Sequence, residues 1–401
     1  MKYYIKKFAG TLIAGWILFL LLAYLYFFEL KRPVEDDQKT FIGFKESQID
    51  EIRLEYPSHS VVARKEGNRW FVVKRSKKYK AESETITGMI GDFAKMKIDK
   101  VVSEVPDGLT EYGLENPRVE VVMKTPEKRH RLRVGKESPV SSGAYAQADY
   151  DRRVVLVDRN SLWRFLDKSA DDLRDKQILS LDKDRIERLR FRAGDSSFEV
   201  EKKNGRWVGR NIPQYIEVDQ DKVEGVVQTF SDLRVVGFVD DRPKDLAQFG
   251  LDVPNAELVL FQNGKSAHLL FSNEKKGDYY TKLTSEDPVY SISEFTFNRM
   301  PKGVNDIRVR NVIKFDTESV SGLDIKGKNA QISVIKKEGV WKIKGDEGVE
   351  IDESKIYELL EEMKSLRVDQ FIEDNLEDLA PFGLAEPEIQ LSIWEGDLKT
   401  T

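Results

Sequence analysis

A six-residue motif occurs three times in this chain, and its spacing is the feature that most restricts the fold. The copies are YGLENP at Tyr112–Pro117, FGLDVP at Phe249–Pro254 and FGLAEP at Phe382–Pro387, and they begin 137 and 133 residues apart. Three tryptophans keep nearly the same spacing: Trp70, Trp207 and Trp341. A period of this length is the size of a domain. The pattern therefore predicts tandem copies of one small domain, not a solenoid of short repeats.

Each unit carries the pattern of one amphipathic helix between its tryptophan and its Gly-Leu motif. Apolar residues fall at relative positions 0, 3, 4, 7 and 10 in all three units, which places them on one helix face. These stripes are Ile86, Met89, Ile90, Phe93 and Met96; Val223, Val226, Val227, Phe230 and Leu233; and Ile356, Leu359, Leu360, Met363 and Leu366. An acidic residue stands at each predicted start (Glu82, Asp219 and Asp352), where it can cap the helix.

The rest of each unit alternates apolar and polar residues over short runs, which is typical of β-strands. Hairpin signals such as Asn204-Gly205 join some of these runs. In the first unit we expect strands at 52–56, 60–65, 69–73, 119–124, 130–134, 144–148 and 154–157, and a short helix at 161–166 with a counterpart at 293–298. Strand runs grouped around one main helix predict an α+β fold, with a small antiparallel sheet in each unit.

These patterns divide the chain into an N-terminal segment (1–32), a linker (33–44) and repeat units at 45–178, 182–313 and 314–401. After its motif proline, the first unit continues for 61 residues and the second for 59, whereas the third has 14. We therefore expect the third unit to be incomplete. Two explanations stay open: the sequence stops early, or a partner completes a sheet whose unpaired edges would otherwise invite aggregation.

The N-terminal segment contains 21 residues without a charged side chain, from Phe8 to Phe28. As a helix this run spans about 30 Å, the thickness of a bilayer hydrocarbon core. Lys2, Lys6 and Lys7 precede it, so the positive-inside rule places the N-terminus in the cytoplasm. We expect an uncleaved single-pass anchor in the cytoplasmic membrane, with most of the chain extracytoplasmic. A cleaved signal peptide and a buried soluble helix are the alternatives.

Composition excludes several classes of function. The 401 residues include no cysteine, which rules out disulfides, thiolate metal sites, iron–sulfur clusters and cysteine nucleophiles. The 65 basic and 70 acidic residues leave no basic excess of the kind that nucleic-acid binding requires. Beyond residue 32 the chain holds 60 basic and 69 acidic residues, a net charge of −9. Such a body does not adhere to anionic lipid by charge alone, so a second membrane contact would need a partner protein.

The residue types needed for catalysis or metal binding lack their usual spacing. His59, His130 and His268 form no H-x-x-x-H or H-E-x-x-H motif, and we interpret them as exposed histidines of strands and turns. The chain has no nucleophile elbow, P-loop or dinucleotide-binding glycine motif. We therefore expect no catalytic residues, no metal site and no cofactor.

Acidic residues follow the helix of each unit at equivalent places, in the pairs Ser103-Glu104, Asp240-Asp241 and Glu373-Asp374. A hard cation such as Ca²⁺ prefers carboxylate oxygens, but the chain contains no dense calcium-binding loop. We interpret these acids as a solvated charged face.

The repeated motifs are explained by structure. Glycine permits a positive φ, leucine can fill the core, and proline can start an extended strand, while the tryptophans are expected in the core. The residues assigned these structural roles are Trp70, Gly113, Leu114, Pro117, Trp207, Gly250, Leu251, Pro254, Trp341, Gly383, Leu384 and Pro387.

The combination of a hairpin that ends in Trp, an acid-started helix, the Leu-x-x-[Tyr/Phe]-Gly-Leu-x-x-Pro motif and a small sheet resembles the domain of unknown function 4340 family. The residues that carry the resemblance in the first unit are Trp70, Glu82, Leu109 and Tyr112–Pro117, with counterparts in the other two units. The resemblance implies a bacterial protein with one N-terminal anchor that accompanies ABC-type transporter components similar to gliding-motility auxiliary proteins. The family supplies no catalytic residues. The first unit departs from it at Glu82-Ser83, where an Ala-Asp pair is favoured.

These expectations combine into a hypothesis of function. The chain is expected to be a non-enzymatic, membrane-anchored scaffold of the bacterial envelope that serves an ABC-type transport system through a membrane-protein partner. The alternative is a module that binds a glycan, a peptide or Ca²⁺ in clefts between domains. A third hypothesis, an envelope hydrolase, would need polar clusters that occur in one unit only.

Overall fold

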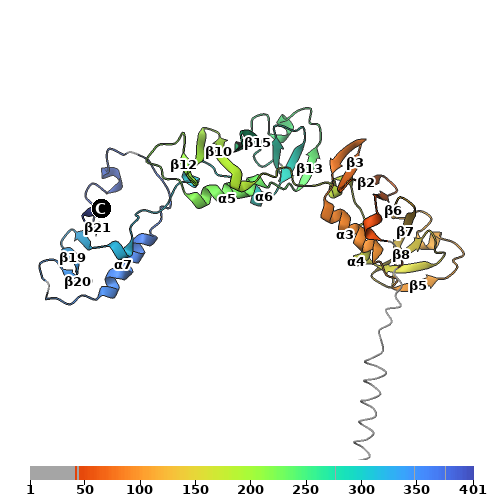
Figure 1. Cartoon of the computed structure of the whole chain (residues 1–401), viewed down its shortest axis with the longest axis horizontal. Helices are drawn as coiled ribbons and strands as arrows, with labels where there is room; N and C mark the ends of the chain where they lie inside the picture. Colours follow the sequence, from red (N-terminus) through yellow and green to blue (C-terminus); the bar gives the residue numbers. More distant parts are fainter. Residues whose placement is uncertain (1–40, 43–44, 276, 347, 375) are drawn as a thin grey trace, which may run out of the picture. The chain divides into compact units, whose positions relative to one another are not determined.

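The computed structural model describes residues 41–42, 45–275, 277–346, 348–374 and 376–401. The chain divides into two compact units, one that ends at Lys176 and one that begins at Gln177, and each is described by itself. Among the described residues, the first unit contains one antiparallel sheet and the second contains two (Figure 1). The predicted α+β class is confirmed in these residues. None of their helices is long and apolar enough to cross a membrane, and the apolar run at 8–28 lies outside them.

The sheet of the first unit has nine strands in the order β4-β3-β2-β1-β6-β7-β8-β9-β5. Their bounds are β1 (Glu51–Glu55), β2 (Ser60–Glu66), β3 (Arg69–Lys74), β4 (Lys77–Lys80), β5 (Lys100–Ser103), β6 (Val119–Lys124), β7 (Arg129–Glu137), β8 (Gly143–Ala148) and β9 (Val154–Asp158). Helices α3 (Ser83–Ala94) and α4 (Arg159–Leu162) meet the core, where Phe93 and Phe165 pack edge to face at 6.1 Å. Buried and partly exposed residues alternate along β6, so one sheet face covers the core and the other meets solvent.

The second unit begins with a closely related repeat of eight strands in the order β12-β11-β10-β14-β15-β16-β17-β13. The strands are β10 (Ile186–Ala193), β11 (Ser196–Lys203), β12 (Arg206–Gly209), β13 (Gly237–Asp240), β14 (Ala256–Gln262), β15 (Lys265–Phe271), β16 (Tyr279–Leu283) and β17 (Val289–Ile292). Helix α5 (Gln220–Ser231) lies across one face of this sheet and α6 (Glu294–Asn298) follows β17 (Figure 1).

A five-stranded sheet in the order β20-β19-β18-β21-β22 forms the third repeat. Its strands are β18 (Gly322–Gly327), β19 (Gln331–Lys337), β20 (Val340–Ile343), β21 (Ile389–Glu395) and β22 (Leu398–Thr400), and its helix is α7 (Glu353–Ser365). By position in the repeat, β21 corresponds to β6 and β14. This sheet therefore holds the first half of the pattern seen in the other two.

The predicted helix stripes face the cores. All five stripe residues are buried in the first and second repeats, whereas Leu366, the last residue of the third stripe, is half exposed. Asp219 and Asp352 cap α5 and α7 through backbone N–H groups, as expected. Glu82 occupies the N-cap position of α3, but its side chain forms no capping hydrogen bond with the helix.

Several local expectations were wrong in detail. Strands β4 and β5 were not predicted, and the first short helix covers Arg159–Leu162 rather than 161–166. Each Gly-Leu motif starts with a 3₁₀ turn, at Thr110–Tyr112, Ala247–Phe249 and Ala380–Phe382. The strand after the first motif, β6, has the predicted bounds of 119–124, and in all three repeats this strand begins two residues after the motif proline.

An incoming segment pairs with the end of each main helix. The N–H of Phe41 donates to the carbonyl of Met96, and Ile178 and Val312 make the equivalent bonds to Leu233 and Leu366. These short backbone pairings had no sequence signal, yet they recur in all three repeats.

An outgoing segment pairs with the residue that starts each of the first two helices. The N–H of Glu82 donates to the carbonyl of Leu173, and that of Asp219 donates to Ile307. In the second unit, the N–H of Val309 also donates to Glu217, three residues before Val312 bonds Leu366. One short linker is therefore hydrogen bonded to both repeats that it joins.

Candidate functional site

The Gly-Leu motif is a structural device in the first two repeats. Gly113, Gly250 and Gly383 have φ values of 68°, 67° and 71°, the left-handed conformation that glycine tolerates best. At Gly113 a Cβ would lie 3.0 Å from the backbone nitrogen of Lys136, so space also requires glycine there. Leu114 and Leu251 are each 1% exposed and therefore buried as expected, and Leu251 packs with Phe249 and Val289 in a small cluster apart from the main core.

The third copy of the motif differs in burial. Leu384 is 57% exposed, in contrast to Leu114 and Leu251. Ile389, the first residue of the following strand, is 65% exposed, whereas the equivalent Val119 and Ala256 are buried. The expectation that the motif leucine fills the core is therefore wrong for the third repeat, because the strands that cover it in the other repeats have no described counterpart there.

The three tryptophans belong to the cores. Trp70, Trp207 and Trp341 are between 2% and 6% exposed. The indole N–H of Trp207 donates to Glu224 on α5 at 2.9 Å, and its backbone N–H donates to the Gln220 side chain at 2.7 Å. These contacts hold β12 against the start of α5, so the tryptophan has a packing role.

The histidines do not converge. His59 is exposed in the turn after β1, stacks on Tyr56 at 4.6 Å and contacts the carbonyl of Lys168 through Nε2 at 2.8 Å. His268 on β15 contacts Glu257 through Nε2 at 2.9 Å. His130 was interpreted as exposed, but it is 5% exposed on β7 and faces the core, opposite Met123. Burial, and secondarily the nearby Lys128 charge, lowers the pKa of His130.

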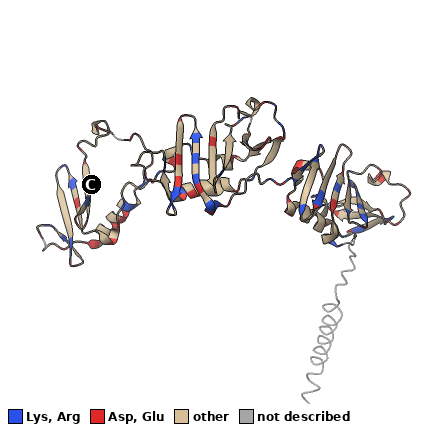
Figure 2. Ribbon diagram, turned by 45° about the horizontal axis from the view of Figure 1, so that its top comes forward, with Lys and Arg blue, Asp and Glu red and all other residues tan. Residues whose placement is uncertain are grey.

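Acidic and basic residues both occur along the strands of the second repeat's sheet (Figure 2), and on its outer face they form a series of ion pairs. Glu199 on β11 is 6% exposed and accepts hydrogen bonds from Arg190 at 2.7 Å and Arg188 at 3.3 Å. Arg210 also lies 3.2 Å from Glu199. Arg188 stacks over the Phe261 ring at 3.7 Å. These arginines are engaged with their own sheet.

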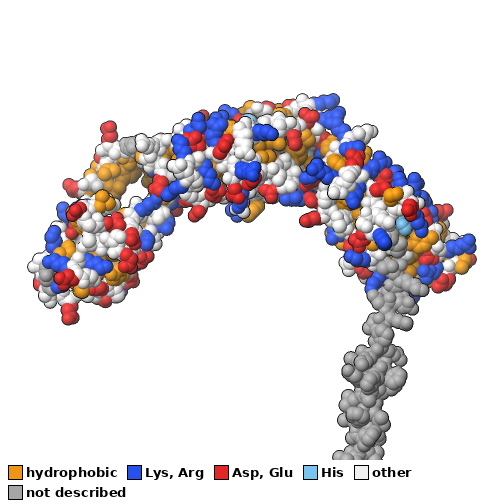
Figure 3. All heavy atoms as spheres, in the orientation of Figure 1, with side chains coloured by type: hydrophobic (Ala, Val, Ile, Leu, Met, Phe, Trp, Pro, Cys, Tyr) orange, Lys and Arg blue, Asp and Glu red, His pale blue; other side chains and the backbone are white. Residues whose placement is uncertain are grey.

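Glu257 forms a second cluster on the same face. Burial alone would raise the pKa of Glu257, but hydrogen bonds from Arg192 and His268 outweigh it and lower the pKa. In the first repeat, Glu120 similarly lies between Arg131 at 3.2 Å and Arg133 at 3.5 Å. On the face of the molecule in Figure 3, acidic and basic side chains intermix instead of gathering into a field of one sign.

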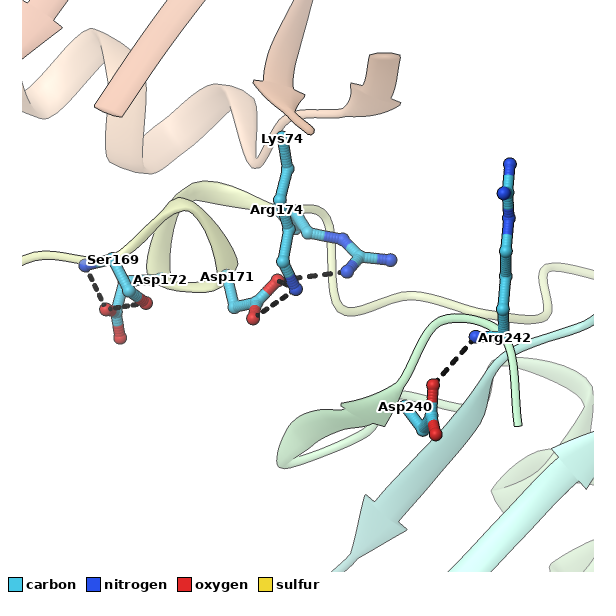
Figure 4. A network of polar contacts seen from close by, with 7 residues as sticks. All are labelled: Lys74, Ser169, Asp171, Asp172, Arg174, Asp240 and Arg242. Carbon is cyan, nitrogen blue, oxygen red and sulfur yellow. Dashed lines mark hydrogen bonds and ion pairs between the residues drawn. The ribbon is translucent and has the colours of Figure 1, made fainter. Parts of the chain in front are cut away.

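The outgoing segment of the first unit carries its own polar cluster (Figure 4). Lys74, the last residue of β3, contacts both carboxylate oxygens of Asp171, at 2.9 and 2.7 Å, and Arg174 donates to Asp171 at 2.9 Å. Ser169 and Asp172 form a capping box on the same 3₁₀ turn, Ala170–Leu173, that carries Asp171. The cluster secures this segment to the sheet.

In the second unit, the acids after the helix are partly committed to structure. Asp240 accepts the backbone N–H of Arg242 at 2.8 Å (Figure 4), and Asp374 accepts a hydrogen bond from Arg308 at 2.7 Å. Arg308 also stacks on Phe371 at 3.9 Å. Asp374 is exposed, as expected for a solvated acid, but it also has a specific partner in Arg308. Sequence reasoning missed Arg174 and Arg308, although their spacing of 134 residues follows the repeat period.

A cleft of about 670 Å³ opens beside α5 in the second repeat. Its wall is formed by the exposed side of α5 and by the segment after α6. The residues that line it are Asp221, Lys222, Gly225, Val226, Asn298, Arg299, Met300, Pro301, Lys302, Asp306, Ile307 and Arg310. Four of these side chains are cationic and two are acidic. This cleft was not anticipated from the sequence.

No group of three or more histidine, aspartate or glutamate side chains placed to hold a metal ion occurs in the described parts of the chain.

Comparison with known proteins identifies a family for this chain. No curated protein matches the chain, and no solved structure matches it either. The family model described as a domain of unknown function (DUF4340) matches twice, at residues 70–239 and 210–387, and the chain therefore belongs to the DUF4340 family as a tandem member.

Proposed function

We propose that this protein is a non-enzymatic scaffold, anchored in the cytoplasmic membrane of a bacterium, that binds a membrane-protein partner on the extracytoplasmic side. The observation that carries the proposal is that the repeats have similar cores but different surfaces. Residues shared by the copies, such as Trp70, Trp207 and Trp341, are buried in cores. Charged surface positions differ between the copies, as at the exposed Arg159 and Glu294, which begin the equivalent short helices. Three related modules with different surfaces suit a protein that makes several contacts.

The proposed anchor is the apolar run from Phe8 to Phe28. Its length matches a bilayer core, and the three lysines before it favour a cytoplasmic N-terminus. The rest of the chain, with a net charge of −9, would then lie outside the cytoplasm. Alkaline extraction of membranes and protease protection of the intact chain test the anchor and its orientation. Extraction of the full-length chain into the soluble fraction would contradict this part of the proposal.

The proposed partner is a component of an ABC-type transporter, as the family resemblance implies. Cross-linking of the full chain in native membranes, followed by mass spectrometry, tests the partner. We expect the same transporter component to be recovered reproducibly, with cross-links to surface lysines of the repeats. A chain that carries only residues 1–44 fused to an unrelated soluble domain serves as the control for chance proximity in the membrane. Recovery of the same proteins by that control would remove the scaffold proposal.

The alternative function is a module that binds an envelope glycan, a peptide or Ca²⁺. The observation that favours it is the cleft of about 670 Å³ beside α5, a volume typical of ligand sites. A ligand that binds the native state raises the melting temperature in proportion to the logarithm of its concentration. Unchanged melting of the purified chain with Ca²⁺, cell-wall glycan fragments and peptides would remove this alternative.

A further inference from the structure

We propose that the cleft beside α5 in the second repeat binds a carboxylate-rich segment of a partner protein. The proposal deepens the scaffold function and rests on it, because it names the chemistry by which one repeat would recognise its partner. Two repeats of the same chain differ at this place. The first repeat fills the equivalent position with its own residues, and the second leaves it open.

In the first repeat, an arginine closes the space over a helix glycine. Gly88 lies in the middle of α3, and a Cβ placed there would be 3.2 to 3.4 Å from the guanidinium of Arg164. The Nε of Arg164 donates to Asp92 on the same helix at 2.7 Å. Asp92 therefore holds the guanidinium over Gly88, and the helix itself supplies the carboxylate.

In the second repeat, the glycine and the arginine are present but the carboxylate is not. Gly225 corresponds to Gly88, and a Cβ there would have no neighbour within 4 Å. Arg299 corresponds to Arg164, since each stands six residues after the N-cap of its short helix. The position of Asp92 is taken by Thr229, whose hydroxyl donates to the carbonyl of Gly225.

Arg299, which has no equivalent of Asp92 to hold it, lines the open cleft. Arg299 is exposed and stacks on Phe295 at 4.8 Å, and it forms no ion pair with any residue that the structure describes. A carboxylate from outside the repeat can therefore take the role that Asp92 plays in the first one. A charge-assisted contact to a planar guanidinium favours a carboxylate that can accept two hydrogen bonds.

Other cations of the cleft add to the same preference. Lys222 and Lys302 are exposed, and neither forms an ion pair among the described residues. Arg310 donates through its Nη1 to the carbonyls of Val368 and Asp369, which carry no net charge, and it forms no ion pair among the described residues. Of the two acids, Asp306 already accepts the backbone N–H of Lys302 at 2.6 Å. The cleft is thus net positive in a chain whose net charge is −5.

The test uses the purified full chain in detergent and a fluorescein-labelled hexaglutamate peptide as the probe, with fluorescence anisotropy as the readout. We expect saturable binding that weakens as salt is raised. Labelled hexaglutamine should not bind. The variant pair Arg299→Gln with Lys302→Gln should weaken hexaglutamate binding roughly fourfold or more. The matched control, Lys265→Gln with Lys328→Gln, removes the same charge from other exposed positions and should leave binding unchanged.

A second variant tests the comparison with Asp92 of the first repeat directly. Thr229→Asp restores the carboxylate of the first repeat, so we expect it to occupy Arg299 and weaken hexaglutamate binding about threefold. Thr229→Asn matches it in shape without the charge and should bind as the original chain does. Circular dichroism and melting temperature show that each variant is folded.

Three results would overturn the proposal: no binding of hexaglutamate, equal loss in the matched control, or a tripolyphosphate competitor that binds the same residues more tightly than the peptide. The last result would reassign the cleft to a phosphate ligand. None of these results affects partner recovery by cross-linking in membranes, so failure of the cleft and failure of the scaffold function can be told apart.

Discussion

The guanidinium of Arg308 lies 3.9 Å from the ring of Phe371 and donates to Asp374 at 2.7 Å. Arg308 belongs to the segment that leaves the second repeat, whereas Phe371 and Asp374 belong to the third. A single side chain therefore joins the two repeats by stacking and by a charge-assisted hydrogen bond. The Arg308 side chain is 16% exposed, so solvent screens this pair less than a fully exposed one.

We expect Arg308→Ala to loosen this junction. Loss of the hydrogen bond and the stacking should cost about 1–2 kcal/mol locally. Limited proteolysis of the full chain should then cut faster within residues 307–313. Arg308→Lys keeps the charge but not the planar group, so an intermediate rate is expected. Lys328→Ala, at an exposed ion pair, is the control, and cleavage rates equal across all variants would contradict the joining role of Arg308.

Leucines at equivalent motif positions should differ sharply in their contribution to stability. Leu251 is 1% exposed, so Leu251→Ala is expected to cost about 2–5 kcal/mol of unfolding free energy. Leu384 is 57% exposed, and Leu384→Ala should cost less than about 0.5 kcal/mol. Denaturant titration of each variant measures the difference. A large loss from Leu384→Ala would mean that another molecule or segment covers this position in solution.

Alanine substitutions at three glycines separate the cost of a left-handed backbone from the cost of a steric contact. Gly250→Ala forces a left-handed conformation, with φ at 67°, and should destabilise by about 1–2 kcal/mol. Gly225→Ala lies within a helix with open space around it and should stabilise by about 0.5–1 kcal/mol. Gly88→Ala should gain less, because the Arg164 guanidinium must move. Equal melting temperatures for Gly88→Ala and Gly225→Ala would contradict the filled and open states assigned to the two helices.

Buried His130 should make the first unit sensitive to mild acid. Burial lowers the pKa of His130 below its value of 6.5 in the unfolded chain, so the unfolded state binds the proton more readily. Stability should therefore be full above pH 6.5 and fall as the pH drops from there through the folded-state pKa. His130→Gln should flatten this part of the denaturation profile. His59→Gln, at an exposed turn, is the control, and a profile unchanged by His130→Gln would refute the assignment.

Sequence periodicity was sufficient to predict the helices and strands that have one buried apolar face. The helix stripes and the strand β6 face a core, so their apolar residues recur at intervals that show in the sequence. Strand β4 consists of Lys77, Lys78, Tyr79 and Lys80 and lies at the edge of the sheet. Its pairing with β3 comes from backbone hydrogen bonds, which leave no apolar pattern to detect.

The candidate sites were less predictable for a related reason. His130 and His268 follow their motifs at similar distances, but they lie one position apart in register and therefore face opposite sides of their sheets. The cleft depends on Thr229 in place of Asp92, a difference whose meaning appears only when Arg164 and Arg299 are seen in place.

The linker between the second and third repeats has a mechanical consequence. Its N–H groups at Val309 and Val312 are bonded to Glu217 in one repeat and to Leu366 in the other. Three residues of fully extended chain span only about 10 Å, so the linker holds almost no slack. A force that separates the two repeats would act on these hydrogen bonds immediately, because the linker has no further length to extend. This junction would therefore transmit tension directly between the second and third repeats.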